Sequence, residues 1–305
     1  MSRPCLPALA VSLLLSAAAL GQPLYLTTPD WVSQDDLVGT GGALADLDRD
    51  GWLDLIVSAG NDMEPQPLVV YYNNGDGTYP PLPDWQSADL VFNGHLDVAD
   101  VDGDGWLDVA VATLGEFQTF GPVARVYFNQ QGTLQGTPGW TADLVGNAFG
   151  IAFGDMNNDG RPDLAVGTGW AYSPEHPYVN VVYLNEGGTL SATPAWTSAD
   201  THHLQGLCWV DADGDGWLDL AGAAANARSR VYCNTAGLLD ATSCWQLTDV
   251  ATQDAIMVTA GDVTGDGRPD LLLADNKQLP GSGRFRQYSG VASGTSMPTT
   301  VRCAS

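Results

Sequence analysis

Carboxylate side chains recur at fixed spacing in a nine-residue segment that occurs five times in this sequence. In the fourth copy, residues 211–219, aspartate fills positions 1, 3, 5 and 9 and glycine fills position 6. Four carboxylates so close together repel one another unless a cation lies among them. Calcium is a hard cation that takes about six to eight oxygen ligands in flexible geometry, and glycine lets the backbone turn around it. The segment therefore predicts a calcium-binding loop in which position 7 contributes its backbone carbonyl.

The other four copies repeat this pattern with small changes. The ligand sets predicted at positions 1, 3, 5, 7 and 9 are Asp46, Asp48, Asp50, Trp52 and Asp54; Asp100, Asp102, Asp104, Trp106 and Asp108; Asp155, Asn157, Asp159, Arg161 and Asp163; Asp211, Asp213, Asp215, Trp217 and Asp219; and Asp262, Thr264, Asp266, Arg268 and Asp270. Successive loops begin 54, 55, 56 and 51 residues apart, a period typical of propellers and other repeat arrays. We expect about five Ca²⁺ ions, bound more weakly by the third and fifth loops, which each lack one carboxylate.

The residues around each loop predict strands. An EF-hand loop has twelve residues, ends in a bidentate Glu and lies between helices, whereas these loops are followed by short apolar runs typical of buried strands, such as residues 55–57 and 271–273. A Val-Tyr-x-Asn segment follows each of the first four loops, and one tryptophan precedes each loop: Trp31, Trp85, Trp140, Trp196 and Trp245. We expect these tryptophans to pack between repeats. The sequence thus predicts an all-β chain, a β-propeller of about five four-stranded blades, each with a calcium-binding hairpin loop.

The repeat resembles the FG-GAP or VCBS-type repeats, which are related to the calcium-loop propeller of integrin α subunits. The resemblance rests on the five acidic loops and on the segments 159–164 and 72–78, and it covers roughly residues 22–290. It implies a calcium-stabilised propeller, commonly secreted or at a surface. The individual repeats are expected near residues 31–84, 85–139, 140–195, 196–244 and 245–290.

Closure of the propeller depends on the chain ends. Residues 24–31 match residues 189–196, the segment that leads into Trp196, and so could supply the outer strand of the fifth blade. The C-terminal tail, residues 291–305, contains a fainter match at 294–298 and competes for the same position. The family more often has seven blades. We expect a closed five-bladed ring, with an open or truncated array as the alternative.

The N-terminal residues predict export. A basic start, an apolar run over residues 9–20 and small residues before Gln22 are typical of a signal peptide that comprises residues 1–21. The apolar run is too short to predict a membrane span. Outside the cytoplasm, Cys208, Cys233, Cys244 and Cys303 can form disulfides, and the sequence leaves all three pairings open. The net charge of −25 opposes nucleic-acid binding.

The segments between the second and third strands vary most in length, and loops that vary on a constant frame often bind ligands. Strand alternation places them on the face opposite the calcium loops. Their aromatic residues are candidates for stacking on a sugar or anchoring a protein: Phe117, Phe120, Trp170, Tyr172 and Tyr178. The alternative is that these loops pack on their own blades.

Residues for catalysis are scarce. The four histidines form no spaced constellation, no nucleophile motif is present, and Lys277 is the one lysine in the sequence. We therefore predict no catalytic residues and expect a secreted, non-catalytic binding or adhesion module for a glycan or an extracellular protein. The alternative is a carbohydrate-active enzyme, a polysaccharide lyase or hydrolase on a calcium-stabilised propeller.

Overall fold

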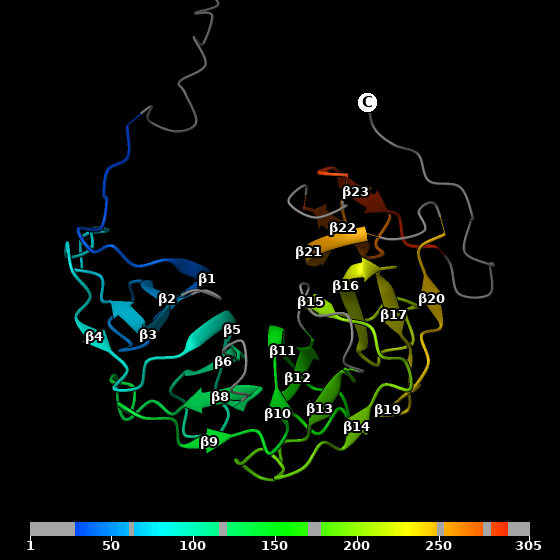
Figure 1. Ribbon diagram of the computed structural model, residues 1–305, viewed down its shortest axis with the longest axis horizontal. Helices are drawn as coiled ribbons and strands as arrows, with labels where there is room; N and C mark the ends of the chain where they lie inside the picture. The colour runs from blue at the N-terminus through cyan, green and yellow to red at the C-terminus, as the bar shows by residue number, and fades with distance from the viewer. Residues whose placement is uncertain are drawn as a thin grey trace, which may run out of the picture.

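The computed structural model describes residues 28–60, 64–115, 121–169, 178–248, 253–276 and 282–291. Within these ranges the chain forms strands and turns and no helix. No helix long and apolar enough to cross a membrane was found in the described part of the chain. The predicted signal peptide lies outside the described residues. Five antiparallel sheets follow one another in chain order along an arc (Figure 1).

The predicted four-stranded unit is present in the first four sheets, each with its strands in chain order from the inside of the arc to the outside. The first sheet consists of β1 (Gly39–Ala45), β2 (Asp54–Gly60), β3 (Pro65–Tyr71) and β4 (Trp85–Gln86). The second consists of β5 (Phe92–Ala99), β6 (Asp108–Leu114), β8 (Ala124–Tyr127) and β9 (Trp140–Thr141). The third consists of β11 (Ala148–Gly154), β12 (Asp163–Thr168), β13 (Val181–Tyr183) and β14 (Trp196–Thr197). The fourth consists of β15 (Leu204–Val210), β16 (Asp219–Ala227), β17 (Arg230–Tyr232) and β20 (Trp245–Gln246).

The fifth sheet has three strands in the described residues: β21 (Gln253–Gly261), β22 (Asp270–Asp275) and β23 (Phe285–Tyr288). Strand β21 also pairs with the end of β16, so hydrogen bonding continues between the fourth and fifth sheets. Two further short pairs are β7 (Gly121–Pro122) with β10 (Val145–Gly146), which lies outside the repeat, and β18 (Asn234–Thr235) with β19 (Leu238–Leu239). The second pair corresponds to the bridges Asn129–Leu134 and Asn185–Leu190 of the second and third sheets.

Each acidic segment connects the first two strands of a sheet, as the apolar run after it predicts. The last residue of the inner strand pairs with position 9 of the loop, for example Ala45 with Asp54 and Val210 with Asp219. Because the second strands are buried on both faces, they read as continuous apolar runs; every residue of β6 is buried.

The hydrophobic core lies between neighbouring sheets. One cluster joins Val126 of the second sheet to Ile151 and Phe153 of the third, and three similar clusters fill the other interfaces. The expected packing of the periodic tryptophans is confirmed. Trp85, Trp140, Trp196 and Trp245 each lie edge-on against a tyrosine of the next sheet, with ring centroids 5.0–6.2 Å apart.

The innermost strands approach one another most closely at glycine. A Cβ atom on Gly150 would lie 3.0 Å from the carbonyl oxygen of Gln205, and one on Gly206 would lie 2.8 Å from the Cα of Met257. Each inner strand also carries a register irregularity here. Small residues and bulges therefore bring the sheets together along the inside of the arc.

The sheets form an open arc, so the expected closed ring is wrong for the described residues. Inner strands contact in the order β1, β5, β11, β15 and β21, and the first and fifth sheets lie apart at the two ends of the arc (Figure 1). In the fifth sheet Met257 occupies the position on the inner strand that Gly150 and Gly206 occupy in the third and fourth sheets, directly after the register irregularity. Met257 is 54% exposed. Its side chain would hold a further inner strand away.

The expected clasp between the chain start and the fifth sheet is also absent among the described residues. Trp31 lies against Tyr71 of the first sheet, with ring centroids 5.3 Å apart. Residues 24–27 and the tail beyond Val291 lie outside the described residues.

Candidate calcium-binding loops

The first aspartate and the glycine of each loop hold its turn. The carboxylate of Asp46 accepts a hydrogen bond from the Gly51 amide at 3.1 Å, and the other four loops repeat this bond at 2.7–3.0 Å. The glycine at position 6 has φ between 82° and 92° in all five loops. This left-handed conformation is the one that glycine adopts without strain, as the sequence argument required.

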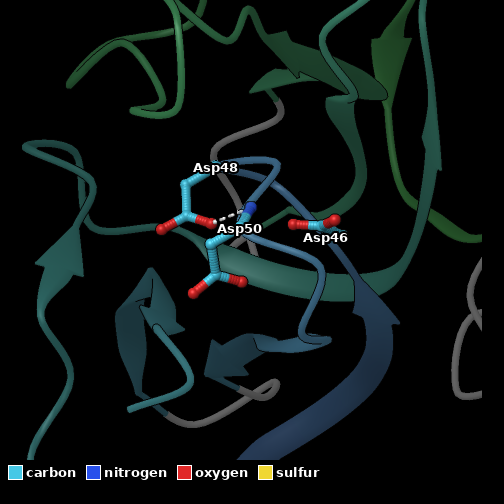
Figure 2. Close-up of side chains that lie close together, drawn as sticks. All are labelled: Asp46, Asp48 and Asp50. Atoms are coloured by element: carbon cyan, nitrogen blue, oxygen red, sulfur yellow. Dashed lines mark hydrogen bonds between the residues drawn. The ribbon is translucent and has the colours of Figure 1, made fainter. Parts of the chain in front are cut away.

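The aspartates at positions 3 and 5 each accept a hydrogen bond from the amide two residues later. In the first loop Asp48 accepts from the Asp50 amide at 3.1 Å, and Asp50 accepts from the Trp52 amide at 2.8 Å. These bonds turn the side chains toward the same side of the loop. Figure 2 shows Asp46, Asp48 and Asp50 close together.

In three loops, one oxygen from each of three carboxylates lies within 4.8 Å of the others. The groups are Asp46, Asp48 and Asp50; Asp100, Asp102 and Asp108; and Asp211, Asp213 and Asp219. The Oδ1 atom of Asp46 is buried and has no hydrogen-bond partner among the described residues. A buried carboxylate oxygen requires a partner, and the all-oxygen donor set suits Ca²⁺, so these loops fit the ion.

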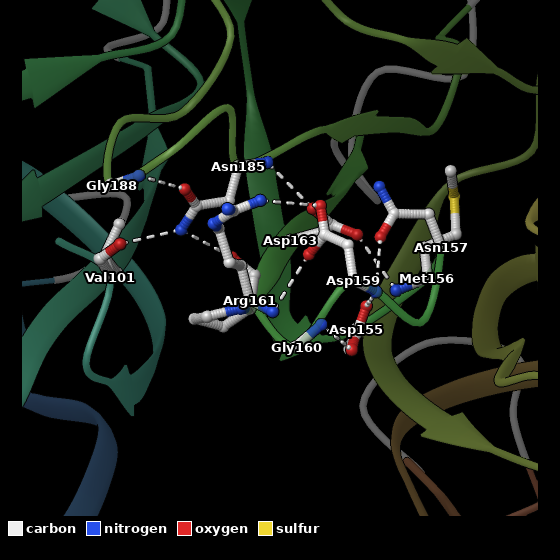
Figure 3. A network of polar contacts seen from close by, with 11 residues as sticks. Val101, Asp155, Met156, Asn157, Asp159, Gly160, Arg161, Asp163, Asn185 and Gly188 are labelled. Atoms are coloured by element: carbon white, nitrogen blue, oxygen red, sulfur yellow. Dashed lines mark hydrogen bonds and ion pairs between the residues drawn. The ribbon is translucent and has the colours of Figure 1, made fainter. Parts of the chain in front are cut away.

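The third and fifth loops, in which Asn157 and Thr264 replace one acid, are not among these carboxylate groups. In these loops the arginine at position 7 also bonds the aspartate at position 5. Arg161 donates to Asp159 at 3.1 Å (Figure 3), and Arg268 donates to Asp266 at 3.4 Å. A guanidinium group already neutralises part of the charge there, which agrees with the expectation of weaker binding.

The aspartate at position 9 is buried in every loop, with at most 1% of its surface exposed. Its two oxygens accept hydrogen bonds from two amides. For Asp108 the donors are Val101 and Asn129, both at 2.8 Å. Burial raises the pKa of Asp108, and likewise of Asp163 and Asp219, to about 6. A cation beside these carboxylates would offset the cost of burying their charge.

Most of the predicted ligand-binding residues lie outside the described part of the chain. Phe117, Phe120, Trp170 and Tyr172 lie outside the described residues, and Tyr178 is described and half-buried. Their role in binding remains a prediction. Burial lowers the pKa of His95 to about 4 and of His203 to about 3. No group of potential metal ligands found among the described residues contains a histidine.

One disulfide resolves part of the pairing that the sequence leaves open. Cys233 and Cys244 are bonded and join the end of β17 to the start of β20. Cys208 has a free, half-buried thiol, and Cys303 lies outside the described residues.

Sequence analysis did not assign a function to the asparagine of the Val-Tyr-x-Asn segment. In the second, third and fourth sheets its amide group donates to the carbonyl of position 2 in the loop of the preceding sheet, at 2.7–2.9 Å. The four-residue marker was visible in the sequence, but its partners lie 78–84 residues away. No local signal identifies such a contact.

Comparison with known proteins gives the family. The FG-GAP-like repeat model matches residues 46–111, 116–166 and 211–273, which is more than half of the chain. This chain therefore belongs to the FG-GAP-like repeat family, as the sequence resemblance predicted.

Curated relatives match over shorter stretches. The chain is 36% identical to integrin alpha-6 of Gallus gallus over 86 residues, which are 25% of this chain and 8% of the integrin. It is 34% identical to phosphatidylinositol-glycan-specific phospholipase D of Rattus norvegicus over 155 residues, which are 44% of this chain and 17% of the phospholipase. The chain thus spans less than a fifth of the length of these relatives.

Two solved structures align with most of this chain at low sequence identity. The rhamnogalacturonan lyase YesW aligns with a TM-score of 0.50 and 17% identity, over 85% of this chain and 50% of the lyase. The V. cholerae biofilm matrix protein Bap1 aligns with a TM-score of 0.49 and 18% identity, over 84% and 38% respectively. At this identity the likeness to the lyase concerns the fold alone.

Proposed function

We propose that this chain is a secreted calcium-binding β-propeller that acts as a non-catalytic binding or adhesion module for a glycan or an extracellular protein. The observation that carries the proposal is the recurrence of one oxygen-rich hairpin loop in all five sheets. A catalytic metal needs an open position near converging acid and base groups. One similar loop per sheet, with its oxygens turned inward by its own amides, is instead what structural ions require.

In this proposal the side chains at positions 1, 3, 5 and 9 of each loop, together with the carbonyl of position 7, hold one Ca²⁺ ion. The ion supplies positive charge beside carboxylates that are otherwise crowded or buried. Position 9 begins the second strand of each sheet, so the ion joins the hairpin turn to the buried centre of the sheet. Similarity to integrin alpha chains over the loop repeats supports the adhesion role and the extracellular location.

The ligand would bind the face opposite the calcium loops, through the segments that connect second and third strands. Phe117, Phe120, Trp170, Tyr172 and Tyr178 are the residues that we propose for this contact. Aromatic rings offer a flat apolar surface that fits the face of a sugar ring or a pocket of a protein partner.

Calcium titration by calorimetry tests the loop assignment. We expect the wild type to bind about five ions and Asp213→Ala to bind one fewer. Asp240→Ala is the matched control, because Asp240 is an exposed aspartate outside the loops. Unchanged stoichiometry in Asp213→Ala, or the loss of an ion in Asp240→Ala, would contradict the assignment.

A binding assay on a glycan array, with and without chelator, tests the binding role. The proposal predicts a calcium-dependent ligand that is retained without turnover, and weakened binding in Tyr178→Ala. Incubation with the same polysaccharides should release no new reducing ends or unsaturated products. Catalytic turnover would replace the binding role with that of a lyase or hydrolase.

A further inference from the structure

The loops of neighbouring sheets are hydrogen-bonded to one another through a buried asparagine. The side-chain Nδ2 of Asn129 in the second sheet donates to the carbonyl of Leu47 in the first loop at 2.9 Å. The backbone amide of Asn129 donates to Asp108 of the second loop at 2.8 Å. Only 2% of its surface is exposed. One residue thus contacts both predicted calcium loops.

The same bonds join the next two pairs of loops. The side-chain Nδ2 of Asn185 donates to the carbonyl of Val101 in the second loop at 2.7 Å, and the backbone amide of Asn185 donates to Asp163 of the third loop at 2.8 Å (Figure 3). In the same way the side-chain Nδ2 of Asn234 donates to the carbonyl of Met156 in the third loop, and its backbone amide donates to Asp219 of the fourth loop, both at 2.7 Å.

Within each loop these contacts are linked through the residue at position 2. The carbonyl oxygen of Val101 accepts a hydrogen bond from the side chain of Asn185, and the backbone amide of Val101 donates one to Asp108 at 2.8 Å. Met156 makes the equivalent bond to Asp163 at 2.9 Å. The buried position-9 carboxylates of the first four loops therefore belong to one chain of hydrogen bonds.

A second contact brings the same segments against the preceding loop. The turn after each asparagine packs on position 3, since a Cβ atom on Gly132 would lie 3.2 Å from the Cβ of Asp48, and one on Gly188 would lie 2.8 Å from the carbonyl oxygen of Asp102. The asparagine turn thus touches both a predicted ligand of one loop and the position-9 ligand of the next.

The chain of bonds ends at both ends of the array. Asn73 of the first sheet donates to Leu53 of its own loop at 3.3 Å, and no loop precedes it among the described residues. In the fifth sheet Gly290 takes the place of the asparagine: its amide donates to Asp270 at 2.9 Å, but it has no side chain to reach the fourth loop. A cavity of about 610 Å³ separates the fourth and fifth loops, lined by residues that include Ala212, Asp213 and Arg268.

We propose that Asn129, Asn185 and Asn234 are positioning residues that couple calcium binding among the first four loops, and that the fifth loop binds independently. This inference rests on the proposed calcium-binding function. An ion that fixes positions 3 and 9 of one loop also fixes the position-2 carbonyl between them, to which the asparagine of the next sheet donates. It likewise fixes the surface at position 3 on which the turn after that asparagine packs. Part of the ordering needed by the neighbouring loop is then already complete.

The test uses the full chain labelled with ¹⁵N and titrated with Ca²⁺. The position-6 amides of Gly51, Gly105, Gly160, Gly216 and Gly267 each donate to the first aspartate of their loop and provide one NMR reporter per loop. Asp102→Ala empties the second loop. We expect the calcium affinities of the first and third loops to fall about fivefold or more, and that of the fifth to stay unchanged.

The decisive measurement is a double-mutant cycle. In Asn185→Ala the effect of Asp102→Ala on the third loop should disappear, whereas its effect on the first loop, which passes through Asn129, should persist. Asn185→Leu has nearly the shape of asparagine without its donors and should behave in the same way. Asn73→Ala is the matched control, because it removes the equivalent bonds inside one sheet and none between loops; the coupling should survive.

Independent titration of all loops in the wild type, or coupling that survives Asn185→Ala, would overturn this inference and leave the proposed function intact. Absence of calcium binding in the wild type would overturn both.

Discussion

At the scale of single residues, the burial of the position-9 aspartates is a reason for the cation that we propose in each loop. Asp108, Asp163 and Asp219 are fully buried, and burial raises the pKa of each to about 6. Two backbone amides bond each carboxylate but do not neutralise its charge. Replacing such a side chain by an apolar one would remove the ion and also leave two buried amides without partners.

The carboxylates and glycines of the loops could be predicted from the sequence because their partners lie within five residues. The asparagines could not be assigned, since Asn185 reaches a carbonyl 84 residues earlier. Contacts within a loop follow from the spacing of residues in the sequence, whereas a contact between repeats depends on how two sheets pack against each other.

We expect His95 to make the stability of the folded protein depend on pH. Its ring lies on Phe149 with centroids 4.5 Å apart, and burial lowers its pKa to about 4, below the usual value near 6.5. The unfolded chain therefore binds the proton more tightly, so the stability gained from a neutral His95 is complete above about pH 6.5 and is lost as the pH falls toward 4.

Thermal unfolding of the calcium-free protein measures this pH-dependent contribution of His95 to stability. The midpoint of the wild type should fall relative to that of His95→Phe as the pH decreases from 7 to 4.5, and the difference should be constant above pH 7. Groups common to both proteins cancel in this comparison. Parallel pH profiles would show that His95 does not titrate in this range.

At the scale of elements, the close approach of inner strands makes glycine necessary. Gly206→Ala places a Cβ atom 2.8 Å from the Met257 Cα and 2.9 Å from the Ile256 carbonyl oxygen. Overpacking of this kind should lower the free energy of unfolding by about 1–3 kcal/mol. Gly261→Ala is the matched control, because no atom lies within 4 Å of its added Cβ.

Urea denaturation in excess calcium gives both values. The account requires a clear loss of stability in Gly206→Ala and little change, or a small gain, in Gly261→Ala. Equal effects of the two substitutions would show that the inner strands are not held at this distance.

The disulfide between Cys233 and Cys244 closes a short segment, with a sequence separation of 11. Its removal in a Cys233→Ser, Cys244→Ser double variant should lower the free energy of unfolding by roughly 3 kcal/mol, by the usual scale for loops of this size. The comparison uses urea denaturation in excess calcium. A variant as stable as the wild type would mean that the bond does not constrain the unfolded chain.

The hairpins, the four-stranded order and the tryptophan packing were predictable because they repeat. A pattern that recurs at one period in the sequence indicates a shared structural unit and not a chance match. The sequence did not predict the β7–β10 pair or the three-stranded fifth sheet. Gly121 and Val145, which lie in the short pair, occur outside the repeat, so no comparison within the chain could identify them.

At the scale of the whole molecule, the open arc differs from the ring expected from five regular repeats. Regular spacing fixes how many units there are, but the rotation between sheets depends on the side chains at each interface. Met257, on the inner strand at the end of the arc, has an exposed side chain that a further inner strand would meet. Small-angle scattering should fit the open arc; a profile matching a closed disc would restore the ring.

The central claim is that calcium in the acidic loops holds the sheets of this array together. One site at 100-fold calcium excess over its dissociation constant adds about 2.7 kcal/mol, and each kcal/mol moves the midpoint by roughly 2–4 °C in a domain of 150–250 residues. Thermal unfolding in calcium and in EDTA is therefore the most direct test. We expect EDTA to lower the midpoint by about 10 °C or more and calcium to restore it. An identical midpoint in calcium and in EDTA would contradict the account.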